Sequence, residues 1–511
     1  MRLGLERSVA IHYGLGAFSQ SNAISYIHGS STWGAINIYD SQWGEAIERD
    51  VCVVGGGSSG VQGAVSLADI NKTVILIEKS DHLGGHCTTY VDPETKTPVD
   101  YGVVIHQDID AVTEFFDKFG VPIIKVLPET FTLPGAPVNH SLPALFYGTL
   151  RNDVDFRDGS AVNVSTDPES VTDGIARLIG ILSQYSYLLE GGNIPDPLPE
   201  DLLLPFGAFL QRHHLEAVIP RYYQFSQGMG SLLHITTIYV VKYYNLDDLR
   251  LAKPYLTVGT GHISDAFAAA GEFLGPSNVL LGSVVVASNR TADRMELLVS
   301  SPSGSGNLKL LSCGQILYTI PPTLENLAGW DLSAHETAVF KQYTSANGYW
   351  TGLVTGVGLN QTESYWNAAK TTASHIPVLP ALYNLVPVGV LNDTWLVKFG
   401  ADTPAMDIDL VKRYIARDIR TLQQVNNVSS TTAADLKFLA FESHAPFQLQ
   451  VSPEVIRAGF FNDLAALQGG FQGRMFYSGA AFHTHYTSLL WRFNKDIVIP
   501  LMANSSGGAG K

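Results

Sequence analysis

The feature that most constrains the fold of this chain is a glycine-rich turn between an apolar strand and a helix. The apolar run at residues 51–54 leads directly into residues 55–60, which read Gly-Gly-Gly-Ser-Ser-Gly. A second apolar run at residues 74–77 ends on an acid, Glu78. This order of strand, glycine turn, helix, strand and acid predicts the βαβ unit of a Rossmann-type nucleotide-binding domain.

Each residue of the turn has a physical reason to be there. Gly55 permits the tight turn out of the strand, and Gly57 lets the backbone approach a pyrophosphate. Gly60 lets the helix pack on the strand, while N–H groups at the helix start receive the phosphate charge. The carboxylate of Glu78, roughly 20 residues on, can accept hydrogen bonds from a ribose. We therefore expect the nucleotide to be held by Gly55, Gly57, Ser58, Ser59, Gly60, Glu78 and Lys79.

A paired glycine just after the second strand favours FAD over a nicotinamide cofactor. Gly84 and Gly85 are followed by His86, and only glycine lets the backbone lie beside the ribityl chain and pyrophosphate of an extended flavin. An ordinary turn between strand and loop is the alternative for this segment taken alone.

Two distant segments also favour FAD. Residues 278–286 predict a strand whose backbone could bind an adenine, with Val284 as the best candidate. Residues 474–482 predict a strand that brings Gly479 and Ala480 to the start of a helix over about 487–494, whose positive end would face the flavin ring. A one-piece nicotinamide domain needs no contacts spread so widely, so the sequence predicts FAD.

The order of these motifs resembles that of the amine-oxidase-like FAD-dependent oxidoreductases. Residues 49–60 and 83–103, together with 478–482 and 490–493, look most similar to β-cyclopiazonate dehydrogenase and related flavoenzymes of fungal secondary metabolism. The resemblance implies an α/β chain (α+β overall) with a discontinuous Rossmann-type FAD-binding domain and a mixed sheet-and-helix substrate domain. Two positions depart from the amine-oxidase pattern, because His86 replaces an arginine and Ala480 replaces an acid.

The domain boundaries follow from the positions of these motifs. We expect a leader or poorly structured segment at 1–48, an FAD-binding domain at 49–107, 255–330 and 440–500, a substrate or cap domain at 108–254 and 331–439, and a disordered tail at 501–511.

Composition excludes several classes of partner. The formal net charge of −15 disfavours nucleic acid and anionic membrane surfaces, and no apolar run approaches the roughly 18 residues of a membrane span. The histidines show no metal-ligand spacing, so we expect no metal. The three cysteines are too few for a disulfide framework, and Cys52 reads as a small core residue.

Cellular location is open between the secretory pathway and the cytoplasm. The first 20 residues contain a modest apolar run interrupted by His12 and Tyr13, as in a degenerate leader. A chain that enters the secretory pathway could be a glycoprotein. Acceptor patterns for such modification occur at Asn71, Asn139, Asn163, Asn289, Asn360, Asn392, Asn427 and Asn504.

Three groups of residues could carry chemistry beyond the flavin. The aromatic residues at 222–225 and 243–244 could line a slot for a flat apolar substrate, or could be plain helix core. His483 and His485 are candidate catalytic residues, together with Tyr477 on the preceding strand. The resemblance places this turn near the pyrimidine end of the flavin, and a structural histidine is the alternative. His86 and Cys87 could attach flavin covalently, although packing is favoured.

The resemblance implies hydride removal from a bulky hydrophobic metabolite, as a dehydrogenation or cyclisation step in secondary-metabolite biosynthesis, with O2 as electron acceptor. Three alternatives stay open: a redox-neutral isomerase of polyunsaturated fatty acids, an amine oxidase, and a non-catalytic prenyl-protein-binding scaffold. No residue pattern in the inserts predicts a charged anchor for a small amine or amino acid, although one correctly placed arginine (Arg212, Arg221 or Arg492) would overturn this argument.

Overall fold

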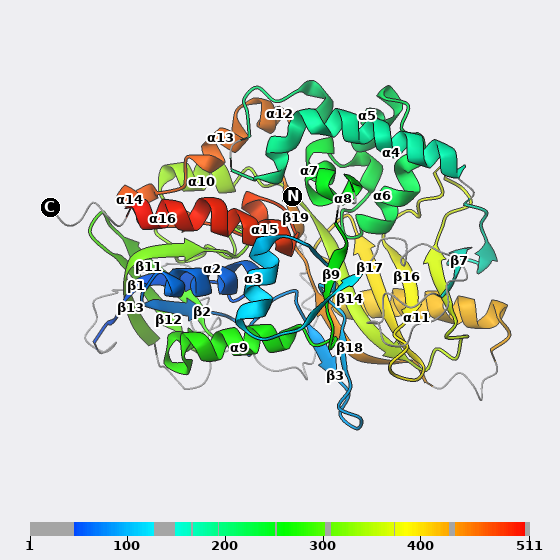
Figure 1. Ribbon diagram of the computed structural model, residues 1–511, viewed down its shortest axis with the longest axis horizontal. Helices are drawn as coiled ribbons and strands as arrows, with labels where there is room; N and C mark the ends of the chain where they lie inside the picture. Colours follow the sequence, from blue (N-terminus) through cyan, green and yellow to red (C-terminus); the bar gives the residue numbers. More distant parts are fainter. Residues whose placement is uncertain are drawn as a thin grey trace, which may run out of the picture.

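The computed structural model describes residues 45–126, 149–164, 167–192, 194–250, 253–301, 308–372, 374–428 and 435–505. Most of the predicted leader and the acceptor Asn139 lie outside these residues. Figure 1 shows two β-sheets side by side, with a group of helices above the second sheet.

The first sheet is the predicted nucleotide-binding sheet. Its central strand, β1 (Ile47–Val54), lies between β2 (Val74–Ile77) and β13 (Leu308–Tyr318), and all three run parallel. The fully buried apolar runs explain this position, because a parallel strand is covered on both faces. The sheet is completed by β10 (Val279–Leu280), β11 (Val284–Arg290), β12 (Met295–Ser300) and β20 (Met475–Tyr477).

Helices from distant parts of the sequence cover this sheet. Helix α2 (Ser58–Asp69) follows the glycine turn and packs against both α9 (Ser264–Leu274) and the C-terminal helix α15 (Thr487–Phe493). The predicted discontinuous assembly is therefore present, since the C-terminal strand and helix return to the N-terminal βαβ unit.

The second sheet has eight strands in the order β18-β14-β17-β16-β15-β7-β8, and β19 pairs with β14. One face packs on the long helix α11 (Ile408–Val425), whose N-cap Asp407 accepts a hydrogen bond from the Leu410 N–H. On the opposite face, Leu353 and Leu396 pack against Val99 and Tyr101. The strands are β7 (Leu150–Asp155), β8 (Ser160–Ala161), β14 (Ser345–Thr355), β15 (Glu363–Asn367), β16 (Ala381–Pro387), β17 (Thr394–Ala401), β18 (Lys437–Ser443) and β19 (Phe447–Gln450).

A layer of helices lies above the second sheet (Figure 1). It comprises α4 (Pro168–Leu182), α5 (Phe206–Arg212), α6 (Ile219–Phe225), α7 (Thr237–Tyr243) and α8 (Leu246–Arg250). One hydrophobic core runs without interruption from the first sheet into this layer, whereas a separate core lies between the second sheet and α11.

Several elements differ from the predicted boundaries. Strand β1 begins at Ile47, and helix α16 (Ile499–Ser505) occupies the start of the segment expected to be a disordered tail. Helix α3 (Asp110–Lys118) packs on α15, and β6 (Ile123–Val126) pairs with β9 (Tyr255–Val258). Both elements follow the boundary expected at residue 107, yet both pack with the nucleotide-binding half.

The cysteines also differ from expectation. Cys52 is buried in β1, as expected of a core residue, but it forms a disulfide with Cys313 of β13, with 5.8 Å between the Cα atoms. Cys87 is a free, buried thiol.

Candidate active site

The glycine turn has the close backbone packing that its sequence predicts. A Cβ atom on Gly60 would lie 1.9 Å from the carbonyl oxygen of Gly55, so only glycine allows α2 to approach β1 this closely. Gly55 adopts a φ of +109°, which also favours glycine.

Gly57 is different, because its Cβ position faces open space. No protein atom lies within 4 Å of that position, and α2 begins at the next residue without a side-chain cap. An open position at an uncapped helix start has the form of an anion-binding site.

The paired glycine runs against this turn. The Gly84 N–H donates to the carbonyl oxygen of Gly56 over 2.8 Å, and a Cβ atom on Gly85 would lie 2.9 Å from the Gly57 Cα. Both residues have positive φ angles, +117° and +56°. The two glycine segments therefore form one continuous backbone surface.

Glu78 closes the other side of the turn. Its carboxylate accepts hydrogen bonds from the N–H groups of Gly56 at 2.6 Å and Ser80 at 2.7 Å. The Ser283 N–H donates to the Glu78 carbonyl oxygen over 2.7 Å, which places the exposed Val284 at the start of β11 beside this region.

The C-terminal segment is tied to the turn by a buried polar network. The hydroxyl groups of Ser59 and Ser478 lie 2.9 Å apart, and Asn494 donates to the Ser59 carbonyl oxygen over 2.8 Å. Gly479 follows at once, with a φ of +88°. Ser59 therefore serves to attach the segment that carries Gly479 and Ala480.

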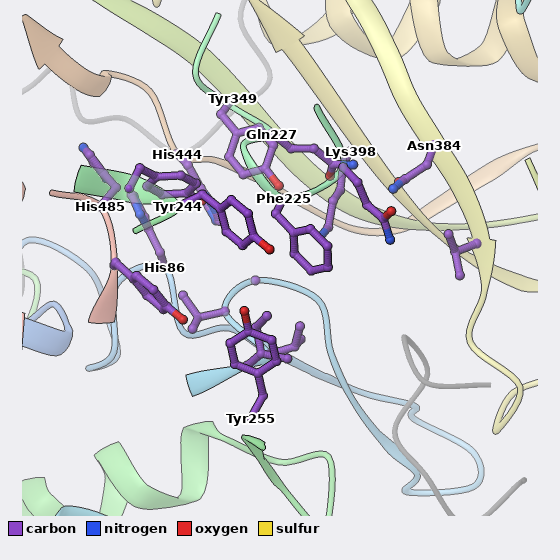
Figure 2. Close-up of a pocket in the computed structure, with 18 of the residues that line it drawn as sticks. His86, Phe225, Gln227, Tyr244, Tyr255, Tyr349, Asn384, Lys398, His444 and His485 are labelled. Carbon is purple, nitrogen blue, oxygen red and sulfur yellow. The ribbon is translucent and has the colours of Figure 1, made fainter. Parts of the chain in front are cut away.

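A cavity of about 220 Å³ lies where this half of the molecule meets the second sheet. Its walls come from the loop after Gly85, from helices α6 to α8, from the cavity-facing side of the second sheet, and from the turn before α15. Figure 2 shows its aromatic and histidine side chains converging on one space.

Three histidines form a stack on one wall of the cavity. The rings of His86 and His444 lie 4.0 Å apart and nearly parallel, and His485 stacks on Phe447 at 4.2 Å. Burial lowers the pKa of His86 to about 4 and lowers the pKa values of His444 and His485 well below the usual range. These rings are therefore uncharged at neutral pH.

A buried carboxylate lies on a second wall. Asp248 of α8 accepts hydrogen bonds from Gln107 at 2.9 Å, from the hydroxyl groups of Tyr486 at 3.0 Å and Tyr255 at 3.3 Å, and from the Asn245 N–H at 3.0 Å. Burial raises the pKa of Asp248 to about 6 despite these four donors.

Comparison with known proteins agrees with this architecture. Residues 53–119 match the NAD(P)-binding Rossmann-like domain family. The chain is 34% identical over 468 residues to the FAD-dependent oxidoreductase oblC of Cochliobolus heterostrophus, with 89% of this chain and 91% of that protein covered. It is 30% identical over 470 residues to the β-cyclopiazonate dehydrogenase of Aspergillus flavus, with 90% and 94% covered.

The chain belongs to the FAD-dependent oxidoreductases. The predicted resemblance, the enzyme class and the FAD cofactor are thereby confirmed.

Solved structures share the fold of this oxidoreductase at low sequence identity. A CLA-producing fatty acid isomerase from P. acnes superposes with a TM-score of 0.66 at 15% identity, covering 88% of this chain and 98% of its own. Cyclohexylamine oxidase from Brevibacterium oxydans superposes with a TM-score of 0.56 at 14% identity, covering 90% and 99%. The α/β fold class with an amine-oxidase-like arrangement is confirmed.

The structure separates the three predicted catalytic residues of the oxidoreductase. His485 lines the cavity. His483 does not, because its ring is buried with Nε2 3.2 Å from the Leu189 carbonyl oxygen. Tyr477 is buried in β20 and donates to Glu336, which forms an ion pair with Arg290.

The predicted aromatic groups also divide. Phe225, Tyr243 and Tyr244 line the cavity, where they are placed to form part of a substrate slot. Tyr222 is fully buried in the main core, and Tyr223 packs against Tyr383 with 5.8 Å between ring centroids.

Three further predicted residues, Lys79, His86 and Cys87, differ in their surroundings. Lys79 is exposed, and His86 faces the cavity. Cys87 is buried, and burial raises the pKa of its thiol, which disfavours the reactive thiolate.

The sequence analysis missed the polar residues that the second sheet contributes. Lys398 of β17, Asn384 of β16 and Arg151 of β7 all line the cavity. The sequence analysis singled out none of these three residues, and the three arginines that it named instead do not line the cavity. One signal was available: Lys398 is the single charge in the otherwise apolar run 395–401.

Within the described residues, no group of three histidine, cysteine or acidic side chains could hold a metal ion. No helix in the same residues is both long and apolar enough to cross a membrane.

Proposed function

We propose that this enzyme removes a hydride from a bulky hydrophobic metabolite, in an oxidative dehydrogenation or cyclisation step of secondary-metabolite biosynthesis, with O2 as electron acceptor. The observation that carries the proposal is the aromatic-lined cavity between the nucleotide-binding half and the second sheet. When bound, FAD accepts a hydride from a C–H bond next to nitrogen, oxygen or an allylic system.

We propose that the glycine surface holds the cofactor. Gly57 leaves room for the pyrophosphate because its Cβ position faces open space, and Gly85 lets the paired-glycine segment, which would lie beside the ribityl chain, pack against Gly57. Glu78 lies at the ribose end, with the backbone at Val284 beside it. The C-terminal segment at Gly479 and Ala480 lies at the flavin end, as the resemblance implies.

We assign different roles to the aromatic residues and the histidines of the cavity. Phe225, Tyr244 and Tyr349 offer flat apolar surface that positions a bulky ring system. The uncharged rings of His86 and His485 keep that wall free of charge. A substrate folded against these walls would bring a nucleophile close to the oxidised carbon, an effective-concentration effect of several kcal/mol.

Asp248 and Tyr486 can accept the proton that an O–H or N–H group loses when the carbon attached to it gives up its hydride. Tyr486 takes that proton on its hydroxyl oxygen while it passes its own proton to the carboxylate 3.0 Å away. The raised pKa of Asp248, about 6, leaves the carboxylate ionised and ready at neutral pH.

Anaerobic mixing tests the proposal and separates its rivals. The purified, FAD-loaded enzyme is incubated with a panel of prenylated aromatic metabolites, polyunsaturated fatty acids and small monoamines, and flavin absorbance is followed. We expect bleaching by the aromatic metabolites, and peroxide release equal to product once O2 is admitted. Bleaching by a small monoamine alone supports amine oxidation, and fatty-acid turnover without oxygen uptake supports isomerisation. A colourless, folded protein would support the binding scaffold.

A further inference from the structure

We infer that the second sheet anchors an anionic oxygen of the substrate, a carboxylate or a deprotonated enol, at Lys398 and Asn384. The inference deepens the proposed function and rests on it, because it takes the cavity to be the substrate site. It concerns the end of the substrate that is held, whereas the proposed function concerns the bond that is oxidised.

Strand pairing in the second sheet makes Asn384 and Lys398 neighbours. Asn384 of β16 and Lys398 of β17 are directly paired across antiparallel strands, where Cβ atoms lie about 4.5–5.5 Å apart. Side chains alternate between faces along a strand. Val397 and Phe399 pack toward α11, so Lys398 points to the opposite face and into the cavity.

Lys398 has no partner for its charge in the part of the chain that the structure describes. Among the residues that the structure describes, its ammonium group makes neither a hydrogen bond nor an ion pair. Arg151, the other cation of the cavity, is already engaged: it pairs with Asp153 at 2.6 Å and stacks on Trp366 at 4.7 Å. The positive charge available to a ligand is therefore that of Lys398.

Asn384 also has an unpaired polar atom, although this atom is a hydrogen-bond acceptor. It is only 2% exposed, and its Oδ1 atom has no hydrogen-bond partner in the described part of the chain. A buried polar atom without a partner costs about 1–3 kcal/mol. The side-chain amide of Asn384 can rotate. Its NH2 group can then donate to a substrate anion bound at Lys398, or its oxygen can accept from a neighbouring donor.

No other charge in the cavity competes for this role. Asp248 already accepts four hydrogen bonds, three of them on Oδ1, and it forms no ion pair with Lys398 in the described residues. The histidine stack is uncharged. Burial lowers the pKa of Lys398 to about 8, which still leaves it protonated at neutral pH. The cavity therefore favours an anion and disfavours an amine.

The anchor lies away from the wall that the nucleotide-binding half supplies. Figure 2 shows His86 and His485 on one side of the cavity, and Lys398 and Asn384 on the other, with Phe225 and Tyr349 between them. An acidic substrate held at this end would lie across the aromatic surface with its opposite end toward the histidines.

A matched probe series tests the anchor without any turnover. The FAD-loaded enzyme is titrated with 4-phenylbutyrate, its methyl ester and 4-phenylbutylamine at pH 7, with calorimetry and the flavin spectrum as readouts. We expect the carboxylate to bind at least tenfold more tightly than either other probe. The Lys398→Met variant should lose this preference, whereas Lys398→Arg should keep most of it.

The control variant is Lys412→Met, which removes the same charge from α11 on the far face of the same sheet. It should bind the three probes as the wild type does. Equal binding of all three probes by the wild-type enzyme would overturn the inference, and so would a carboxylate preference that survives Lys398→Met. If a neutral metabolite still bleaches the flavin in that case, the anchor fails while the proposed function stands.

Discussion

The two halves of this enzyme present different kinds of surface to the ligands that we propose for them. The nucleotide-binding half uses backbone: Gly57, Gly84 and Gly85 form a surface on which side chains are absent, and a Cβ atom on Gly85 would lie 2.9 Å from Gly57. The second sheet uses side chains, since Lys398 and Asn384 extend from paired strands into the cavity.

This difference sets how each half responds to substitution. A backbone surface depends on the absence of side chains, so a single added side chain should block the site. A side-chain surface is defined by a few polar groups on a rigid sheet, so their exchange changes which ligand binds while the sheet survives.

The largest effect is expected from Gly57→Asp. The fold can accept the side chain, because no atom lies within 4 Å of its Cβ position, but the carboxylate would occupy the space assigned to the pyrophosphate. We expect a folded, colourless protein with complete loss of FAD, measured by absorbance and by circular dichroism. Gly180→Asp is the matched control, since Gly180 of α4 also has open space at its Cβ position. A yellow Gly57→Asp protein would contradict this view of the turn.

The second effect concerns the proton-accepting pair. Asp248→Asn should lower the rate of anaerobic flavin reduction about 100-fold, because a carboxamide cannot accept the proton. In the wild type, the rate should fall as the pH drops through about 6, where Asp248 becomes protonated. That decline should vanish in the variant. Asp247→Asn removes a neighbouring carboxylate that pairs with Arg492 at 3.6 Å, and should leave both rate and pH profile unchanged.

The same contrast explains what could be predicted from the sequence. The βαβ unit, its glycines and Glu78 are local in sequence, so their spacing alone indicates the turn and its ligand class. The aromatic residues Phe225 and Tyr244 were also grouped correctly, although the pattern could not tell them from the core residue Tyr222.

The rest depends on pairing between distant strands. Whether Lys398 faces the cavity or α11 depends on the register of β17, and a shift of one residue would reverse it. His444 and His86 meet from segments more than 350 residues apart in sequence. Tyr477 and His483 lie beside predicted flavin-binding residues, but their side chains point into packed interior. Proximity in sequence does not fix the direction of a side chain.

The smallest effect is a gain in stability when the anchor is removed. A half-buried ammonium without a partner in the described part of the chain destabilises the empty enzyme, so Lys398→Met should raise the Tm by about 2 °C at pH 7. The folded-state pKa of Lys398, about 8, lies below its usual value of 10.5. Between these values the unfolded chain binds a proton that the folded chain does not, so wild-type stability rises with pH relative to the variant. The advantage of Lys398→Met should therefore be full below pH 8 and shrink above it, as measured by calorimetry. Lys412→Met should show no such pH dependence, and a lower Tm for Lys398→Met at pH 7 would mean that Lys398 has a stabilising partner in the folded enzyme.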